Sequence, residues 1–290
     1  GLVPLHVWLP IAHPAAPMPA SAVLSGAIIK AGVIGLIRFL PETAAQPGWG
    51  VALAVIGFLT AYWGVAMGLT QRNPKTVLAY SSVSQMGVVA AVIGMGIAQS
   101  IEGTSLHAAF YAMHHVLAKG ALFLGVGVAL MAGRRARVLV VPLALVLALG
   151  FGGLPPTGGA LAKAAVKDEF GAGIAAWCAS VSAFGSTMLM LHFVSRVWIA
   201  AQDAPSAPVG RGLLIPWIGL AVAALLVPWP VAAALVGDAA AKIWSPASLM
   251  PVLAGIALSF AWRRWGERLP AIPEGDIVVV GQPAMRVVVR

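Results

Sequence analysis

Charged side chains are scarce in this sequence: they make up 9% of its 290 residues, whereas soluble domains carry about 25%. Hydrophobic residues make up 60%, which excludes an ordinary water-soluble fold. Cysteine occurs once, at Cys178. Disulfide frameworks and CxxC metal or redox motifs are therefore excluded, and we interpret Cys178 as a small core residue.

The chain starts at Gly1 without a methionine or a basic signal segment, and we expect that a longer chain was trimmed or processed.

Long apolar runs occupy most of the chain, and a helix of about 20 such residues spans the hydrocarbon core of a bilayer. The sequence predicts spans at 17–39, 50–70, 76–98, 104–132, 138–168, 172–198, 212–235 and 246–262. The fifth run contains four glycines and two prolines between Gly152 and Gly159, which a continuous helix does not tolerate. We therefore predict an all-α polytopic membrane protein with about eight transmembrane helices, some of them broken.

The basic residues between these runs are distributed unevenly. Every second connection is rich in them, and these connections hold Arg72, Lys75, Arg134, Arg135, Arg137, Arg196, Arg211, Arg263, Arg264, Arg268, Arg286 and Arg290. The alternate connections hold only Arg38 and Lys242. Because short basic loops stay in the cytoplasm, we predict that the basic set and the C-terminus are cytoplasmic. The net charge of +9 is thus a topology signal, so we expect a lipid bilayer around the chain and no nucleic-acid partner.

These boundaries divide the chain into three parts. Residues 1–16 are predicted to form an interfacial or linking segment, residues 17–262 the transmembrane domain, and residues 263–290 a cytoplasmic tail. The tail contains two short β-prone runs, at 277–280 and 287–289. These runs either pair with a partner's sheet edge or belong to a poorly ordered terminus.

Four lysines fall inside the predicted spans, where a charged group costs about 2.5–3.5 kcal/mol at the bilayer centre. Lys30 and Lys119 lie centrally, and Lys163 follows the Gly/Pro break by one turn, so we predict functional roles for these three. Lys167 lies near a span end beside Asp168, where snorkelling and function are both open readings. Apolar surroundings favour the neutral form of a lysine, so such a group can exchange a proton when a nearby charge moves.

Histidines accompany one of these lysines. His115 and Lys119 are four residues apart and share a helix face, His114 adjoins them, and His107 lies two turns earlier. A single membrane histidine often only bonds a neighbouring helix, but three with a lysine in one span indicate a proton relay. Ser84 belongs to a polar stretch of the third span, and it either supports a water chain or allows close helix packing.

Two segments of the chain resemble each other weakly. In each of them a breaker precedes a short helix that carries a lysine: Pro17 to Pro19 precedes Lys30, and Pro155 to Gly159 precedes Lys163. Interrupted helices in corresponding positions are typical of transporters built from inverted repeats, and they lie at the ion-binding site. The pattern is therefore typical of a repeat-built transporter. By the charge rule both lysine helices run outward from the cytoplasm, whereas neighbouring inverted repeats would run in opposite directions, so either the half-helices of 138–168 are the repeated units or the span count there is off by one.

Several ordered motifs point to one family. They are PLHVWLP at 4–10, AHPAAP at 12–17, IKAG at 29–32, VLAYSSVSQMG at 77–87, HVLAKGALF at 115–123, and GLPP at 153–156 with Lys163 after it. In these motifs the chain resembles the antiporter-like proton-channel subunits of respiratory complex I, membrane-bound hydrogenases, formate hydrogenlyases and multisubunit sodium/proton antiporters. Residues 171–290 resemble the family only in being hydrophobic.

The resemblance implies roles for the buried groups. Lys30 is expected to sense a neighbouring charge, Lys119 with His115 to form the central relay, and Lys163 to be the terminal site, with the helices at 17–39 and 138–168 broken. Family members have about fourteen spans and a glutamate on an earlier helix that pairs with the lysine matching Lys30. The present chain resembles their later part, without that N-terminal portion and its glutamate, and has Thr157 where an aromatic residue is common.

The resemblance also implies a function. We expect a proton- or cation-translocating, non-redox subunit of an NADH-quinone oxidoreductase- or hydrogenase-type complex in a bacterial inner membrane. Its partners are other membrane subunits of that complex, and redox chemistry takes place in partner subunits. The sequence predicts no catalytic residues, no cofactor site and no metal site in this chain. A sodium/proton antiporter subunit, the membrane subunit of an inorganic-carbon uptake system and a structural scaffold remain the alternatives.

Overall fold

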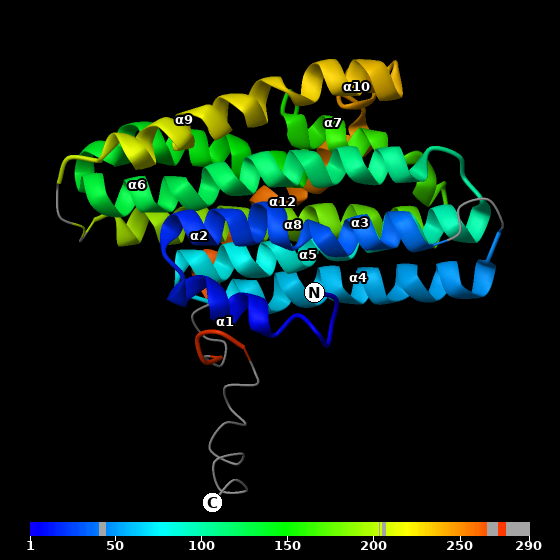
Figure 1. Cartoon of the computed structure of the whole chain (residues 1–290), viewed down its shortest axis with the longest axis horizontal. Coiled ribbons are helices and arrows are strands. Elements are labelled where there is room, and N and C mark those ends of the chain that lie inside the picture. The colour runs from blue at the N-terminus through cyan, green and yellow to red at the C-terminus, as the bar shows by residue number, and fades with distance from the viewer. Residues whose placement is uncertain (41–44, 203, 205–206, 266–271, 277–290) are drawn as a thin grey trace, which may run out of the picture.

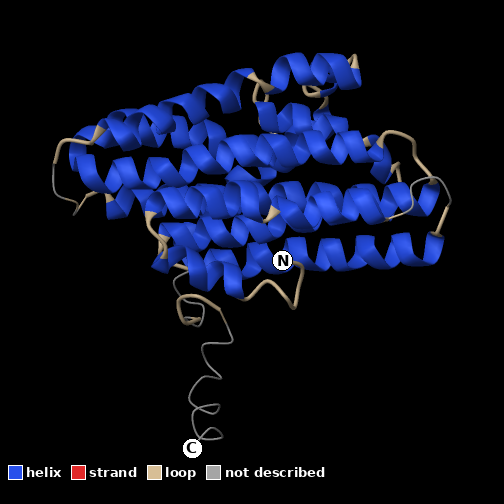
Figure 2. Cartoon of the chain, in the orientation of Figure 1, coloured by secondary structure: helices blue, strands red, loops and turns tan. Residues whose placement is uncertain are grey.

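The computed structural model describes residues 1–40, 45–202, 204, 207–265 and 272–276, except for the side chains of 133–137, 239–240, 263 and 265. Within this part the chain forms helices and no strands (Figures 1 and 2). The helices are α1 (Trp8–Ala15), α2 (Met18–Val23), the π-helix η1 (Leu24–Ile28), α3 (Lys30–Phe39), α4 (Pro47–Thr70), α5 (Pro74–Gln99), α6 (Thr104–Gly152), α7 (Gly158–Ala165), the 3₁₀-helix η2 (Asp168–Phe170), α8 (Ile174–Ala200), α9 (Arg211–Leu226), α10 (Pro228–Val236), α11 (Ala239–Lys242) and α12 (Pro246–Trp265).

The predicted spans are found as helices. Six helical stretches are long and apolar enough to cross a membrane: Met18–Phe39, Pro47–Thr70, Pro74–Gln99, Thr104–Ala132, Ile174–Ala200 and Arg211–Val236. The fifth and eighth predicted spans are shorter, because their apolar helices cover only Val138–Gly152 and Pro246–Trp262. The all-α membrane fold predicted from the sequence is therefore confirmed.

Helix α6 folds back on itself. A Cβ atom on Gly125 would lie 3.6 Å from Val140 Cγ1, although a straight helix separates residues 15 apart by about 22 Å. The half before Ala132 and the half after Val138 therefore lie side by side (Figure 1). This return brings Phe151, near the end of α6, against its middle.

Both predicted breaks are present. In the first span, Ile29 N bonds the Leu24 carbonyl 3.3 Å away, five residues back, so a π-turn immediately precedes Lys30. In the fifth, α6 ends at Gly153, whose φ of +106° favours glycine, and Thr157 caps the start of α7 by accepting from Ala160 N at 3.3 Å. The predicted broken helices are thus confirmed, and each break lies within six residues of a lysine.

Helix α5 lies at the centre of the bundle and is buried along its length as a candidate span. Glycines spaced seven apart allow its close contact with α4: a Cβ on Gly57 would lie 2.6 Å from Gly87 O, and one on Gly50 would lie 2.5 Å from Gly94 O. Small residues permit such approach between membrane helices. The polar middle of α5 is consequently held in the interior.

Some features of the predicted topology stay predictions. The side chains of Arg134, Arg135 and Arg137 and the β-prone tail runs at 277–280 and 287–289 lie outside the described residues. The described segment 272–276 lies beside the start of α5, because Glu274 Oε1 accepts from the amide of Asn73 at 3.1 Å. The start of α5 and this piece of the tail therefore share one end of the bundle, as the charge pattern predicts.

Candidate functional site

Lys30 and His115 meet in the interior. Lys30 Nζ lies 2.5 Å from His115 Nδ1 and donates to the Ser25 carbonyl at 2.8 Å. The lysine is 7% exposed and the histidine is fully buried. The π-turn before Lys30 and the middle of α6 therefore bring together two titratable groups that are 85 residues apart in the sequence.

Lys119 lies one turn further along α6. Its ammonium group donates to the Leu78 carbonyl at 3.1 Å and contacts Ser81 Oγ, both on α5. The group also lies 5.0 Å from the centre of the Phe151 ring, and the side chain is fully buried. The sequence pairs Lys119 with His115 through their spacing, but in the structure His115 contacts Lys30, because the π-turn reaches it from the opposite side.

Lys163 is connected to the interior of the bundle through the side chains of Tyr111, Gln85 and Ser186. Its Nζ lies 5.9 Å from the centre of the Tyr111 ring. Tyr111 donates to Gln85 Oε1 at 2.5 Å, and Gln85 Nε2 donates to Ser186 Oγ at 2.9 Å. These contacts join α7 to α5, α6 and α8.

A cavity of about 120 Å³ lies next to Lys163. Tyr111, Lys167, Ser180 and Ser248 also line it, so it joins the predicted terminal lysine to the exposed Lys167. The cavity is large enough for several water molecules.

Several buried polar atoms near the lysines have no hydrogen-bond partner among the described residues. They are both ring nitrogens of His114, Nε2 of His115, and Oγ of Ser84. Both His114 and His115 pack against Phe151, at ring-centre distances of 5.7 and 5.6 Å. Because buried polar groups are normally satisfied, these atoms leave bonding capacity that water molecules could use.

Two secondary candidates lie apart from these contacts. His107 Nδ1 lies 2.5 Å from Glu169 Oε1, and its side chain is 24% exposed, so it forms a local pair near the start of α6. Lys167 is exposed, and its neighbour Asp168 pairs with Lys242 at 2.8 Å. The geometry fits the snorkelling interpretation of Lys167.

The structure adds two residues that the sequence did not identify as site residues. Lys75 is 7% exposed, donates to the Pro14 carbonyl at 3.2 Å and also contacts the Ala16 carbonyl. His13, on α1, is fully buried and stacks on Phe123 at 4.5 Å. Burial and the nearby charges of Lys119 and Lys75 lower the pKa of His13 to about 3. In the sequence Lys75 follows Arg72 as part of a basic connection, so its burial depends on the contacts with Pro14 and Ala16, which sequence patterns do not reveal.

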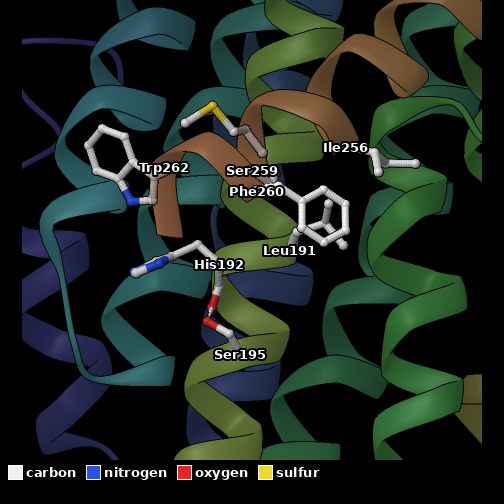
Figure 3. Close-up of a pocket in the computed structure, with 8 residues that line it drawn as sticks. Leu191, His192, Ser195, Ile256, Ser259, Phe260 and Trp262 are labelled. Atoms are coloured by element: carbon white, nitrogen blue, oxygen red, sulfur yellow. Dashed lines mark hydrogen bonds between the residues drawn. The ribbon is translucent and has the colours of Figure 1, made fainter. Parts of the chain in front are cut away.

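A separate pocket of about 130 Å³ lies between α8 and α12 (Figure 3). His192 and Ser195 line it from α8, and Ser259 and Trp262 line it from α12. His192 Nε2 donates to the Gln71 carbonyl at 2.8 Å. The pocket has none of the four intramembrane lysines in its lining, so it is distinct from the site described above.

Several known proteins are similar to this chain in sequence. Hydrogenase-4 component B of Escherichia coli (strain K12) is 38% identical over 142 residues, which are 44% of this chain and 20% of the relative. Formate hydrogenlyase subunit 3 of the same strain is 34% identical over 135 residues (44% and 22%). A putative antiporter subunit mnhA2 of Staphylococcus saprophyticus is 39% identical over 136 residues (43% and 17%). The matches therefore span about a fifth of these relatives.

The fold has a solved counterpart. The Mrp complex from Dietzia sp. DQ12-45-1b contains a chain that superposes with a TM-score of 0.70 at 23% identity, covering 100% of this chain and 36% of its own. Residues 1–190 match the family described as NADH:quinone oxidoreductase/Mrp antiporter, TM. These residues include Lys30, Lys119 and Lys163 with the helices that hold them. The chain belongs to this NADH:quinone oxidoreductase/Mrp antiporter membrane family.

Proposed function

We propose that this chain is a proton-conducting membrane module in which Lys30, His115, Lys119 and Lys163 exchange protons along the membrane plane. The observation that carries the proposal is the 2.5 Å contact between Lys30 Nζ and His115 Nδ1. At this distance a lone pair on one of the two nitrogens accepts a hydrogen from the other. A proton therefore passes between Lys30 on α3 and His115 on α6 without a large movement of either helix. His114 and Ser84 supply further groups with unused bonding capacity.

Repulsion between like charges couples the steps. Two positive charges about 4 Å apart repel by about 4 kcal/mol at an effective dielectric of 20, so Lys30 and His115 do not hold excess protons together. A charge that arrives near Lys30 therefore drives a proton towards Lys119, and loading of Lys119 favours release from Lys163. Lys167 and the cavity beside Lys163, which has room for water molecules, provide a route by which protons leave the terminal site.

The energy source lies in partner membrane subunits. We propose a redox-driven complex of the NADH-quinone oxidoreductase or hydrogenase type, because two relatives are named as hydrogenase and formate hydrogenlyase components. A sodium/proton antiporter assembly is the second candidate, supported by the relative named as an antiporter subunit. We place the chain in a bacterial inner membrane with its C-terminus in the cytoplasm, following the charge pattern of the loops.

The test uses the assembled complex in liposomes loaded with a pH-sensitive dye. We expect His115→Phe and Lys30→Met to reduce proton flux about a hundredfold, the usual effect of losing a positioned proton-transfer group. His107→Gln is the matched control, because His107 lies on the same helix but bonds Glu169. Normal assembly with unchanged flux in the first two variants would refute the proposal. Flux driven by a sodium gradient alone would favour the antiporter assembly.

A further inference from the structure

The described piece of the C-terminal tail, residues 272–276, is held in a pocket beside the start of α5. Asp276 is fully buried, and so are Tyr80 and Gln71 beside it. The contacts join residues about 200 positions apart in the sequence. A short segment without regular secondary structure is fixed in this way only where side chains of the bundle satisfy its backbone.

The pocket recognises the tail backbone and a carboxylate. Gly275 N donates to Gln71 Oε1 at 2.9 Å, and Tyr80 donates its hydroxyl to Gly275 O at 2.8 Å. The Glu274 carboxylate accepts from the amides of Arg72 and Asn73. These amides precede α5, where a negative charge is favoured by the helix dipole.

Asp276 reaches deeper than the rest of the segment. Its Oδ2 lies 2.7 Å from the Tyr80 hydroxyl, whose single hydrogen it shares with Gly275 O, and 3.3 Å from His6 Nε2. The same His6 nitrogen lies 2.8 Å from Trp63 Nε1, which donates to it. One nitrogen cannot accept from Trp63 and donate to Asp276 at once. His6 therefore accepts from Trp63 when Nε2 carries no hydrogen, and it donates to Asp276 when Nε2 carries one.

We propose that residues 272–276 are an intramolecular ligand of the pocket formed by His6, Trp63, Gln71 and Tyr80, and that their docking supplies Asp276 as a carboxylate partner for His6. The tail thereby places an acidic group inside a bundle whose buried ionisable groups are mainly basic. The docking stands on geometry alone. Its effect on proton uptake at this end of the bundle rests on the proposed function.

Amide hydrogen exchange on the full chain in lipid nanodiscs tests the docking. Tyr80→Phe removes the hydroxyl hydrogen that Gly275 O and Asp276 Oδ2 share, so we expect faster exchange at the amides of Arg72 and Asn73. The loss of about 1 kcal/mol for this donor corresponds to about a fivefold change in exchange rate. Asp238→Asn is the control, because Asp238 is exposed and follows α10. Unchanged exchange at both amides in the Tyr80 variant would overturn the docking.

The pairing with His6 is tested separately. The titratable groups that face His6 are Asp276 from the tail, Tyr80 from α5 and the amino group of Gly1. Burial lowers the pKa of His6, and the Asp276 carboxylate counteracts that effect. In Asp276→Asn we expect the pKa of His6, followed by nitrogen NMR, to fall by about one unit. A pKa equal to that of the parent protein would overturn the pairing.

Proton flux separates this inference from the proposed function. If Asp276→Asn lowers the pKa of His6 and also reduces flux, the carboxylate acts in proton uptake. If the pKa falls but flux is unchanged, the docked pair is established and its role in uptake is overturned. If His115→Phe leaves flux unchanged, the relay itself fails, but hydrogen exchange and the His6 titration still decide the docking.

Discussion

Replacing Lys119 by methionine separates stability from conduction. Lys119 is fully buried, and its hydrogen bonds run to the Leu78 carbonyl and Ser81 Oγ. Two such bonds contribute about 2 kcal/mol together, whereas taking an amine out of water costs several kcal/mol if it is charged. Methionine has a similar length and fits beside Phe151, where sulfur makes favourable contacts with aromatic rings. We therefore expect Lys119→Met to stabilise the chain by about 1–3 kcal/mol.

The assay for this variant combines melting with transport. A gain of 1–3 kcal/mol raises the melting temperature of a chain of this size by about 2–10 °C, and proton flux in liposomes should fall about a hundredfold. Arg38→Met is the matched control, because Arg38 is an exposed basic side chain of α3 outside the proposed relay, so both quantities should change little. A Lys119→Met protein that melts lower and still conducts would refute the reasoning. The lysine would then be structural.

Three further results are expected. The pKa of His13 is about 3 in the folded chain and about 6.5 unfolded, so between these values the unfolded state binds the extra proton. Stability should fall by about 2 kcal/mol from pH 6.5 to 5, and His13→Phe should remove that part of the slope in melts recorded at both pH values. Gly57→Val should lower the melting temperature by at least several degrees, because its Cβ would lie 2.6 Å from the Gly87 carbonyl; Gly32→Val, with open space around it, should melt nearly as the parent does. Tyr111→Phe removes the bond to Gln85 and should slow flux with little loss of assembly on native gels; flux at the parent rate would contradict the link to Lys163.

The helices and their breaks could be predicted because their causes are local. An apolar run of sufficient length has few stable forms in a bilayer other than a helix, and Gly152 to Gly159 cannot continue one. Gly159 allows α7 to pack against the end of α6 after the break, because a Cβ there would lie 2.0 Å from the Gly150 carbonyl. The π-turn at Leu24–Ile28 has no such local marker, and the break in the first span was expected only from the family resemblance.

The partners of the site residues could not be predicted, because they depend on tertiary contacts. Spacing places His115 and Lys119 on one face of α6, but it does not say that Lys30 approaches His115 from α3. In the sequence Lys75 has the appearance of a loop charge, and in the structure it is buried because α1 covers it. Asp276, which the sequence places beyond the last span, lies inside the bundle only through its contacts with Tyr80 and His6.

The position of α5 explains why these groups form one system. Its glycines bring α4 close on one side, while its polar residues face α6 and α8 on the others: Ser81 contacts Lys119, and Gln85 joins Tyr111 to Ser186. Tyr80 of the same helix contacts the tail at Gly275, and Lys75 near its start contacts α1 at the Pro14 carbonyl. This central helix thus contacts titratable groups of several helices. Under the proposed function, changes of charge, rather than large movements of α5, transfer protons among them.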